Sequence, residues 1–395
     1  MNPSANGWID KFGSLIADHH DVFQDFPTFY KLLKELGFVY GINVGIPNFI
    51  PTEHELSEDE RAKINLITAL YGTFRLESNG TNFKDFTSSV FKFYKELKIG
   101  NSSLLNRFLV GKNTSAQLEQ LIDSRAFLEE NLIGKTFSSF ITNSLLFIDV
   151  LLYKQYLEDA SEIRKQAQRL EYLTINITYH ALNSKKRNRS DERLEQLFAS
   201  SLTFIEVNEK SFDGHYRKQL VGNKSPWENQ YFLDIACLTV WEDHSLDYQE
   251  SQFVFGFGKD LGFGEMAIKK SLIEVQEFFK INSRSVPFLK DHNLAVQFYD
   301  SMAKVVNKLI LRNSKRLQKE LSQSKELVFL LSKSTIKDLT SEEKKKVQNQ
   351  LLDIFKSIPS LAIFLLPGGA VLLPIFIKLI PKLLPSAFDD NRIEK

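Results

Sequence analysis

Residues 357–377 read SIPSLAIFLLPGGAVLLPIFI and contain no charged side chain. Lys356 precedes this stretch of 21 residues and Lys378 follows it. As one continuous helix the stretch would be about 31 Å long, which is close to the hydrocarbon thickness of a bilayer. The sequence therefore predicts a transmembrane helix near the C-terminal end of the chain.

Prolines recur through this segment. Pro367, Pro374 and Pro381 are seven residues apart and so lie near one face of a helix. Each proline frees the carbonyl four residues earlier, and a freed carbonyl that faces lipid is costly. The proline face is therefore expected to meet another helix, a second copy of the chain or a polar cavity. A kinked anchor packed on its own domain is the alternative to oligomerisation or an ion path. An alternative is a hairpin, divided at Gly368 and Gly369, whose halves are buried within the protein. The residues expected to define the membrane segment are Ile358, Pro367, Gly368, Gly369, Pro374, Ile377 and Pro381.

The overall composition is that of a folded protein with two or three domains. Of 395 residues, 43% are hydrophobic, and 50 basic side chains face 49 acidic ones, so no chain-wide field favours nucleic acid. The lone Cys237 excludes an intrachain disulfide and fits a reducing compartment. Charges at Asp10, Lys11 and Asp18 interrupt the start of the chain, which therefore lacks the apolar core of a secretory signal. We expect the large N-terminal part to be cytoplasmic, with one span in the membrane.

Helical periodicity dominates the rest of the sequence. Phe29, Leu32, Leu33 and Leu36 share one helical face, and Gly37 can end that helix. Strand-like alternation is limited to short pieces such as LTFIEV. The predicted fold class is all-α, a multi-helix domain followed by a proline-kinked transmembrane helix.

Capping signals mark two helix starts. Ser57 and Glu60, and later Thr340 and Glu343, have the spacing of capping boxes. Between these starts, apolar residues near heptad spacing predict a charged helical hairpin or coiled-coil arm within 303–333. The expected regions are 1–160, N-terminal helices; 161–300, a helical domain; 301–350, the charged arm; and 351–395, the membrane segment and tail.

An acidic turn lies within residues 229–279. Asp243, Leu246 and Glu250 have the spacing of the ADGxIxxxE signature, so this region resembles tellurite-resistance B-like domains, with His244 replacing the glycine. Asp243, Asp247 and Glu250 could supply oxygen ligands to a divalent cation. Alternatively, these three acids cap a helix or are solvated charges in a turn.

The C-terminal segment also resembles a known family. IPSLAIFLLPGGAVLLPIFIKLIPKLLPSAFDDN, within about residues 350–390, looks like the membrane segment of the LETM proteins, and still more like bacterial LETM-related, biofilm-associated proteins. The mitochondrial members are associated with proton-coupled potassium or calcium exchange and carry a ribosome-binding domain. Their pattern has an acidic residue where this chain has Ala370. An exchanger needs an ionisable group in the membrane, and this span contains none.

No catalytic or cofactor motif is found. The glycines near Gly262 do not form a dinucleotide loop, and Gly262 is expected to end a helix. Cys237 lies among apolar residues and is expected to be a buried structural thiol. We expect a non-enzymatic protein without cofactors, anchored in a bacterial inner membrane by lipid contacts. The resemblance implies an interaction or scaffold role linked to the envelope or biofilm, with an unknown protein partner. Proton-coupled cation transport or ribosome binding is the alternative.

Overall fold

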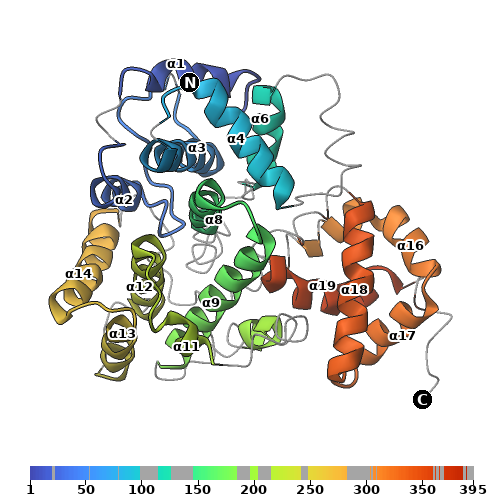
Figure 1. The fold of residues 1–395 in the computed structure, drawn as a ribbon. Helices are drawn as coiled ribbons and strands as arrows, with labels where there is room; N and C mark the ends of the chain where they lie inside the picture. Colours follow the sequence, from blue (N-terminus) through green and yellow to red (C-terminus); the bar gives the residue numbers. More distant parts are fainter. Residues whose placement is uncertain are drawn as a thin grey trace.

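The computed structural model contains only α-helices, turns and loops in the part of the chain that it describes, which confirms the predicted all-α class. The described residues are 1–19, 23–52, 54–78, 80–97, 114–125, 146–184, 196–202, 215–241, 248–282, 303, 306–307, 309–358, 361, 364, 369–385 and 388. The arrangement of the helices is shown in Figure 1.

The helices form two groups along the chain. The first group begins with α1 (Trp8–Ile16), α2 (Phe26–Glu35), α3 (Glu58–Ser78), α4 (Phe83–Glu96), α6 (Thr114–Arg125) and α8 (Leu146–Glu158). It continues with α9 (Ile163–Asn183), α11 (Tyr216–Leu220), α12 (Pro226–Val240), α13 (Tyr248–Asp260) and α14 (Glu265–Asn282). The second group consists of α16 (Ser314–Ser322), α17 (Lys325–Ser334), α18 (Ser341–Ser357) and α19 (Gly369–Leu383).

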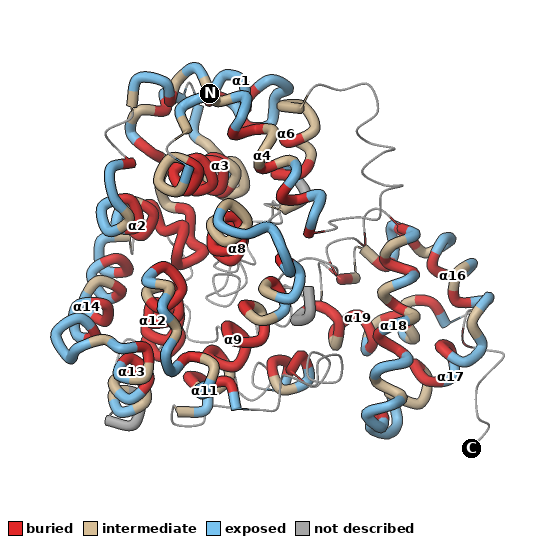
Figure 2. The backbone as a smooth tube through the Cα atoms, viewed as in Figure 1, coloured by how far each residue is buried: buried red, intermediate tan, exposed pale blue. Residues whose placement is uncertain are grey.

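The core of the first group lies around three largely buried helices, α3, α8 and α12. Helix α3 packs on α8, α8 packs on α9, and α9 packs on α12, which in turn contacts α13 and α14. Nearly every side chain of α12 is buried, which explains why its apolar residues are not confined to one face. Figure 2 shows α3, α8 and α12 as largely buried. These three helices hold the surrounding ones in place.

The second group is a compact arrangement of its own. Helices α16 and α17 form a hairpin, and α17 packs against both α18 and α19. The most extensive helix contacts lie within α1–α14 or within α16–α19, and none of them joins the two groups. Residues 303–333, for which we predicted a charged helical hairpin or coiled-coil arm, include α16 and most of α17. The apolar positions of this region, Ile310, Leu317, Leu321, Val328 and Leu331, are all buried.

Local start and stop signals act as predicted. The Ser57 hydroxyl accepts a hydrogen bond from the Glu60 amide, and the Glu60 carboxylate accepts one from the Ser57 amide, which opens α3. Thr340 and Glu343 form the same capping box ahead of α18. Gly37 follows α2 with φ +80°, a conformation that glycine adopts without a steric penalty. Helix α1 was not predicted, although Trp8, Ile9, Phe12 and Ile16 bury one of its faces.

The C-terminal apolar stretch differs from the single continuous helix that we predicted. Helix α18 ends at Ser357, and the next regular helix, α19, begins at Gly369. Pro374 and Pro381 lie inside α19, whereas Pro367 and Gly368 lie outside the described residues. Among the helices that the structure describes, none is long and apolar enough to cross a membrane.

The apolar side chains of α19 are covered by protein. Phe376 of α19 meets Phe355 of α18 and Phe364, with ring centroids 5.0 and 5.1 Å apart. Ile358 and Ile377 of the predicted membrane segment are also buried. The remaining buried apolar side chains of α19 are Leu372, Leu373, Ile375 and Ile380. The four helices α16–α19 therefore share one apolar core.

Candidate functional site

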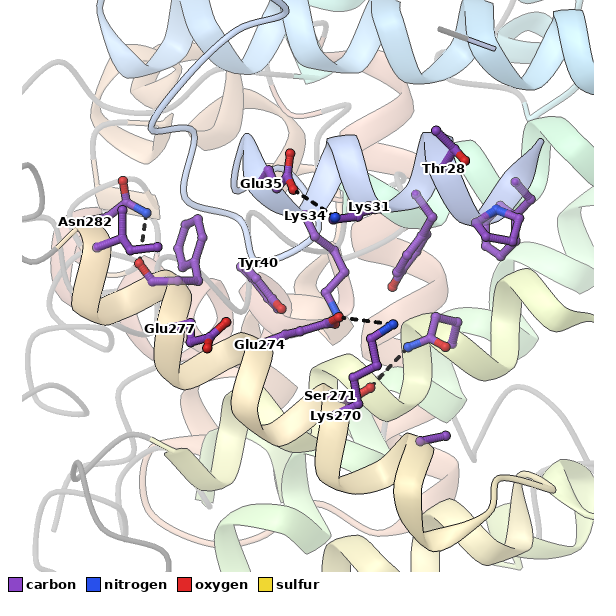
Figure 3. Close-up of a pocket in the computed structure, with 17 residues that line it drawn as sticks. Thr28, Lys31, Lys34, Glu35, Tyr40, Lys270, Ser271, Glu274, Glu277 and Asn282 are labelled. Atoms are coloured by element: carbon purple, nitrogen blue, oxygen red, sulfur yellow. Dashed lines mark hydrogen bonds and ion pairs between the residues drawn. The ribbon is translucent and has the colours of Figure 1, made fainter. Parts of the chain in front are cut away.

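A groove lies between α2 and α14. Its volume is about 940 Å³. One wall comes from α2 and the following loop, the opposite wall comes from α14, and α12 contributes Gln230. Figure 3 shows Lys34, Tyr40 and Glu274 converging between these walls. The groove brings together parts of the chain that lie far apart in the sequence.

A buried lysine forms the floor of the groove. The Lys34 ammonium lies 2.8 Å from an Asp234 carboxylate oxygen and 2.6 Å from a Glu274 carboxylate oxygen. Asp234 also accepts hydrogen bonds from the Tyr30 hydroxyl at 2.8 Å and from the Gln230 amide at 3.2 Å. These contacts join α2, α12 and α14 through one charged cluster.

The sequence of α2 places this lysine on the inner face. Asp25 caps the helix by accepting a hydrogen bond from the Thr28 amide at 2.8 Å. Tyr30 and Lys34 are four residues apart, so both project from the same side of the helix. That side also carries Leu33 and faces α12, where Asp234 is fully buried within the largely apolar run 231–240. The isolated acid in an apolar helix and the lysine on an apolar face therefore satisfy each other.

The electrostatics of the cluster keep the lysine charged. Burial alone would lower the pKa of Lys34, but Asp234, Tyr40 and Glu274 together raise it above its usual range. Burial, and then Asp234, raises the pKa of the Tyr30 phenol. The ammonium therefore stays protonated at neutral pH and is not available as a nucleophile or general base. These residues can position helices and bind a ligand through charge and hydrogen bonds.

Aromatic rings complete the groove. Phe26 stacks on Trp227 of α12 with ring centroids 4.2 Å apart. The ring centroids of Tyr40 and Phe278 of α14 are 5.0 Å apart. The Lys34 ammonium is 5.6 Å from the centre of the Tyr40 ring, close enough for a cation–π interaction. The groove thus offers an aromatic wall above a charged floor.

A second buried ion pair lies inside the α1–α14 group. Arg125 of α6 donates two hydrogen bonds of 2.7 Å to the Asp149 carboxylate of α8, and the Tyr94 hydroxyl donates a third at 2.9 Å. Burial, followed by Asp149, raises the pKa of Tyr94. Since Arg125 and Asp149 are both buried, this cluster acts as a structural link between α4, α6 and α8.

The predicted metal ligands can be placed only in part. Asp243 and Asp247 lie outside the described residues, and Glu250 belongs to α13 without a described side chain. Within the described ranges, no group of three His, Cys, Asp or Glu side chains could hold a metal ion. The metal site therefore stays a prediction. Cys237 is fully buried, and burial raises the pKa of its thiol, as expected for a structural residue.

The groove residues were missed at the sequence level, although a signal was present. Asp149 and Asp234 each stand alone within strongly apolar runs, which is typical of a buried, paired charge. Their partners, Arg125 and Lys34, could not be identified because nothing in local spacing connects them.

A comparison with known families gives one match, at the C-terminal end of the chain. The family described as LETM1-like, RBD, matches residues 339–395, which include α18 and α19. The class defined by fold and match is an all-helical protein with a LETM1-like C-terminal segment. The match includes the proline-rich stretch and supports the resemblance of this C-terminal segment to the LETM-like family. No curated protein matches the chain, and no solved structure does. The tellurite-resistance B-like resemblance stays a prediction.

Proposed function

We propose that this chain is a membrane-associated interaction protein that uses its LETM1-like C-terminal segment for attachment. The observation that carries the proposal is the position of the uncharged stretch 357–377 inside the match at 339–395. A stretch of this length without charge is typical of segments that contact the hydrocarbon of a bilayer. The helices α1–α14 would then act as the part that meets a protein partner.

The packing of α19 is compatible with transfer of its apolar side chains from the protein core to lipid. Leu372, Leu373 and Phe376 are buried next to α17 and α18, and lipid tails offer an equally apolar environment. Opening the α16–α19 group at a membrane would therefore transfer these side chains without exposing them to water. Water alone gives no such compensation, because exposure of apolar area is unfavourable.

The prolines of α19 indicate how such a segment would be accommodated. Pro374 and Pro381 free the carbonyls of Ala370 and Ile377 from helical hydrogen bonding. In a bilayer these carbonyls require polar partners, which a second copy of the chain could supply. We propose a homo-oligomer through this proline face, with one span in a bacterial inner membrane and the helices α1–α14 in the cytoplasm.

The proposed role is that of a non-enzymatic scaffold linked to the envelope or biofilm. The groove between α2 and α14 supports this role, because its lysine is held protonated by Asp234 and Glu274 and is suited to binding rather than to covalent chemistry. Cation transport is less favoured, since Ala370 stands where the LETM pattern has an acid and residues 357–377 carry no ionisable group.

Ribosome binding is a second candidate, supported by one observation. The matched family carries RBD in its description, and LETM proteins have a ribosome-binding domain. Co-sedimentation of the full chain with purified ribosomes tests this candidate. Binding that persists at physiological salt would support it, and absence of the chain from the ribosome pellet would exclude it.

Extraction from membranes tests the principal proposal. The full chain and a version that ends at Gln350 are expressed in bacteria, and their membranes are washed with alkaline carbonate. We expect the full chain to stay in the pellet and the shortened chain to be released. Release of both chains would overturn membrane attachment, and retention of both would show that another part of the protein attaches. Limited proteolysis of the shortened chain checks that α1–α14 remain folded.

A further inference from the structure

Positive charge is concentrated in the C-terminal group. Residues 311–385 carry 13 basic and 6 acidic side chains, whereas the whole chain carries 50 and 49. The remainder therefore holds 37 basic and 43 acidic side chains and has the opposite sign. A chain that is nearly neutral overall thus contains a cationic module next to an anionic one.

The strongest concentration lies on one face of the α16 region. Lys315, Arg316 and Lys319 lie on one side of α16, and Arg312 lies just before the helix, next to its N-cap residue Asn313. All four are exposed. None of the four side chains has a hydrogen-bond or ion-pair partner among the described residues. The opposite side of α16 buries Leu317 and Leu321 against the hairpin partner. We call these four cations the basic stripe.

Exposed apolar residues accompany the basic stripe. Phe329 of α17 is 45% exposed, and Ile336, just beyond the end of α17, is 80% exposed. Lys325, four residues before Phe329, is exposed on the same side of α17. The α16–α17 hairpin thus exposes both cations and large apolar side chains, a combination typical of surfaces that lie at the boundary between lipid headgroups and acyl chains.

The position of the hairpin relates this surface to α19. Helices α16 and α17 form the outer edge of the C-terminal group in Figure 1, on the side away from α1–α14. Helix α17 packs directly on α19, so a surface that engages the hairpin lies one helix away from the apolar LETM1-like segment. Figure 2 shows exposed residues along both helices of this edge.

We propose that the α16–α17 hairpin binds the surface of a bilayer rich in anionic lipids, through the basic stripe and through Phe329 and Ile336. This inference rests on the proposed membrane attachment and specifies its lipid class and orientation. Lipid headgroup phosphates complement Arg312, Lys315, Arg316 and Lys319, and the same surface potential repels the acidic remainder of the chain. The α16–α19 group therefore meets the membrane first, and α1–α14 are held away from it.

Nucleic acid would also attract the basic stripe, but it explains less of the surface. Phosphate contacts account for the four cations, whereas Phe329 and Ile336 find an apolar environment in the acyl boundary of a bilayer. The two exposed apolar residues favour the lipid surface for this reason.

Vesicle flotation of the full chain tests the inference. The vesicles are phosphatidylcholine alone, or phosphatidylcholine with phosphatidylglycerol added. The test variant carries Arg312→Gln, Lys315→Gln, Arg316→Gln and Lys319→Gln. The matched control carries four charge removals at exposed lysines of the other group, Lys11→Gln, Lys84→Gln, Lys92→Gln and Lys269→Gln. Circular dichroism checks that both variants keep the helical fold.

We expect the wild type and the control to bind anionic vesicles in a salt-sensitive manner. The test variant should bind them about 10- to 100-fold more weakly. A second variant, with Phe329→Ser and Ile336→Ser, should lose the binding that remains at high salt. Equal binding of wild type and test variant would overturn the inference, while carbonate resistance of both would leave the proposed attachment standing.

A separate titration tests nucleic acid as the alternative partner of the basic stripe. Wild type and test variant are titrated with a single-stranded RNA labelled with a fluorophore. Tight RNA binding that depends on the basic stripe, together with unchanged vesicle binding by the test variant, would assign this surface to nucleic acid and overturn the lipid inference. Weak RNA binding by both proteins supports it.

Discussion

Lys34 and Asp234 lie 200 positions apart in the sequence, yet their side chains meet at 2.8 Å in a buried ion pair. Asp234 accepts a further hydrogen bond from Tyr30, and Lys34 also contacts Glu274 at the edge of the groove. One charged cluster therefore fixes α2 against α12 and α14. Removal of one partner leaves the other charge buried without compensation, which is far more costly than loss of an exposed pair.

Lys34→Met should consequently lower the free energy of unfolding by about 3–5 kcal/mol. The matched control is Lys31→Met on the same helix, whose partner Glu35 is exposed, and this change should cost less than about 1 kcal/mol. Urea denaturation followed by circular dichroism measures both variants. Similar small losses for the two lysines would contradict a buried cluster at this groove.

The Arg125–Asp149 pair depends on the shape of the guanidinium group. Arg125→Lys keeps the charge but cannot make both 2.7 Å hydrogen bonds, so we expect a loss of about 1–3 kcal/mol. Arg217→Lys, at the partly exposed pair with Asp260, serves as the control and should cost less than about 1 kcal/mol. Thermal unfolding measures both changes, and equal effects would show that the buried geometry is unimportant.

Gly37 and Gly262 each follow a helix, but glycine is favoured at the two positions for different physical reasons. Both have positive φ, +80° and +86°, but a Cβ on Gly37 would overlap the Ile42 carbonyl, whereas one on Gly262 meets no atom within 4 Å. Gly262→Ala should cost about 1–2 kcal/mol from backbone conformation alone. Gly37→Ala should cost about 1–3 kcal/mol more, because the overlap is added. Denaturant midpoints of the two variants measure this difference in stability loss. The difference vanishes if the turn at Gly37 shifts enough to accommodate the added Cβ.

His180 should make stability depend on pH. Burial, and then Arg217, lowers the pKa of this imidazole in the folded chain. The unfolded chain therefore binds a proton more readily, so stability falls as pH drops through the usual histidine value of about 6.5 toward the lower folded value, and it is fully retained above. His180→Asn should reduce this dependence between about pH 7.5 and about pH 5.5. Thermal midpoints measured across the range give the comparison, and identical profiles would contradict the assignment.

Phe376 reports on the packing of the LETM1-like segment. Its ring contacts Phe355 and Phe364, so Phe376→Ala should destabilise the α16–α19 group by about 3–5 kcal/mol in water. Phe329→Ala removes a half-exposed ring from the same group and should have a much smaller effect. Hydrogen exchange in α17–α19 measures both. Under the proposed attachment the difference between the variants shrinks when vesicles are added, and an unchanged difference would argue that α19 stays within the protein.

Several elements could be predicted because their determinants are local. Ser57 with Glu60 and Thr340 with Glu343 sit three residues apart, and each pair satisfies backbone amides of its own helix. Apolar spacing predicted a helical hairpin or coiled-coil arm within 303–333, where α16 and most of α17 lie, and Ser324 between them caps α17. Such signals depend on the chain within one or two turns and need no knowledge of distant residues.

The candidate site could not be predicted in the same way. Asp234 within an apolar run indicated a buried charge, but its partner Lys34 comes from another helix, and the intervening fold brings them together. The acids proposed as metal ligands, Asp243 and Asp247, lie outside the described residues, so their role stays a prediction.

The sequence by itself determined that the chain is helical, where α3 and α18 begin, and that its C-terminal segment resembles the LETM family, because periodicity, capping and motif are properties of neighbouring residues. Only the tertiary structure decided that Lys34 pairs with Asp234 and Glu274, and that apolar residues of α19 pack against α17 and α18. Those outcomes depend on which surfaces meet when the whole chain buries its apolar area. The spacing of neighbouring residues does not specify which distant segments pair.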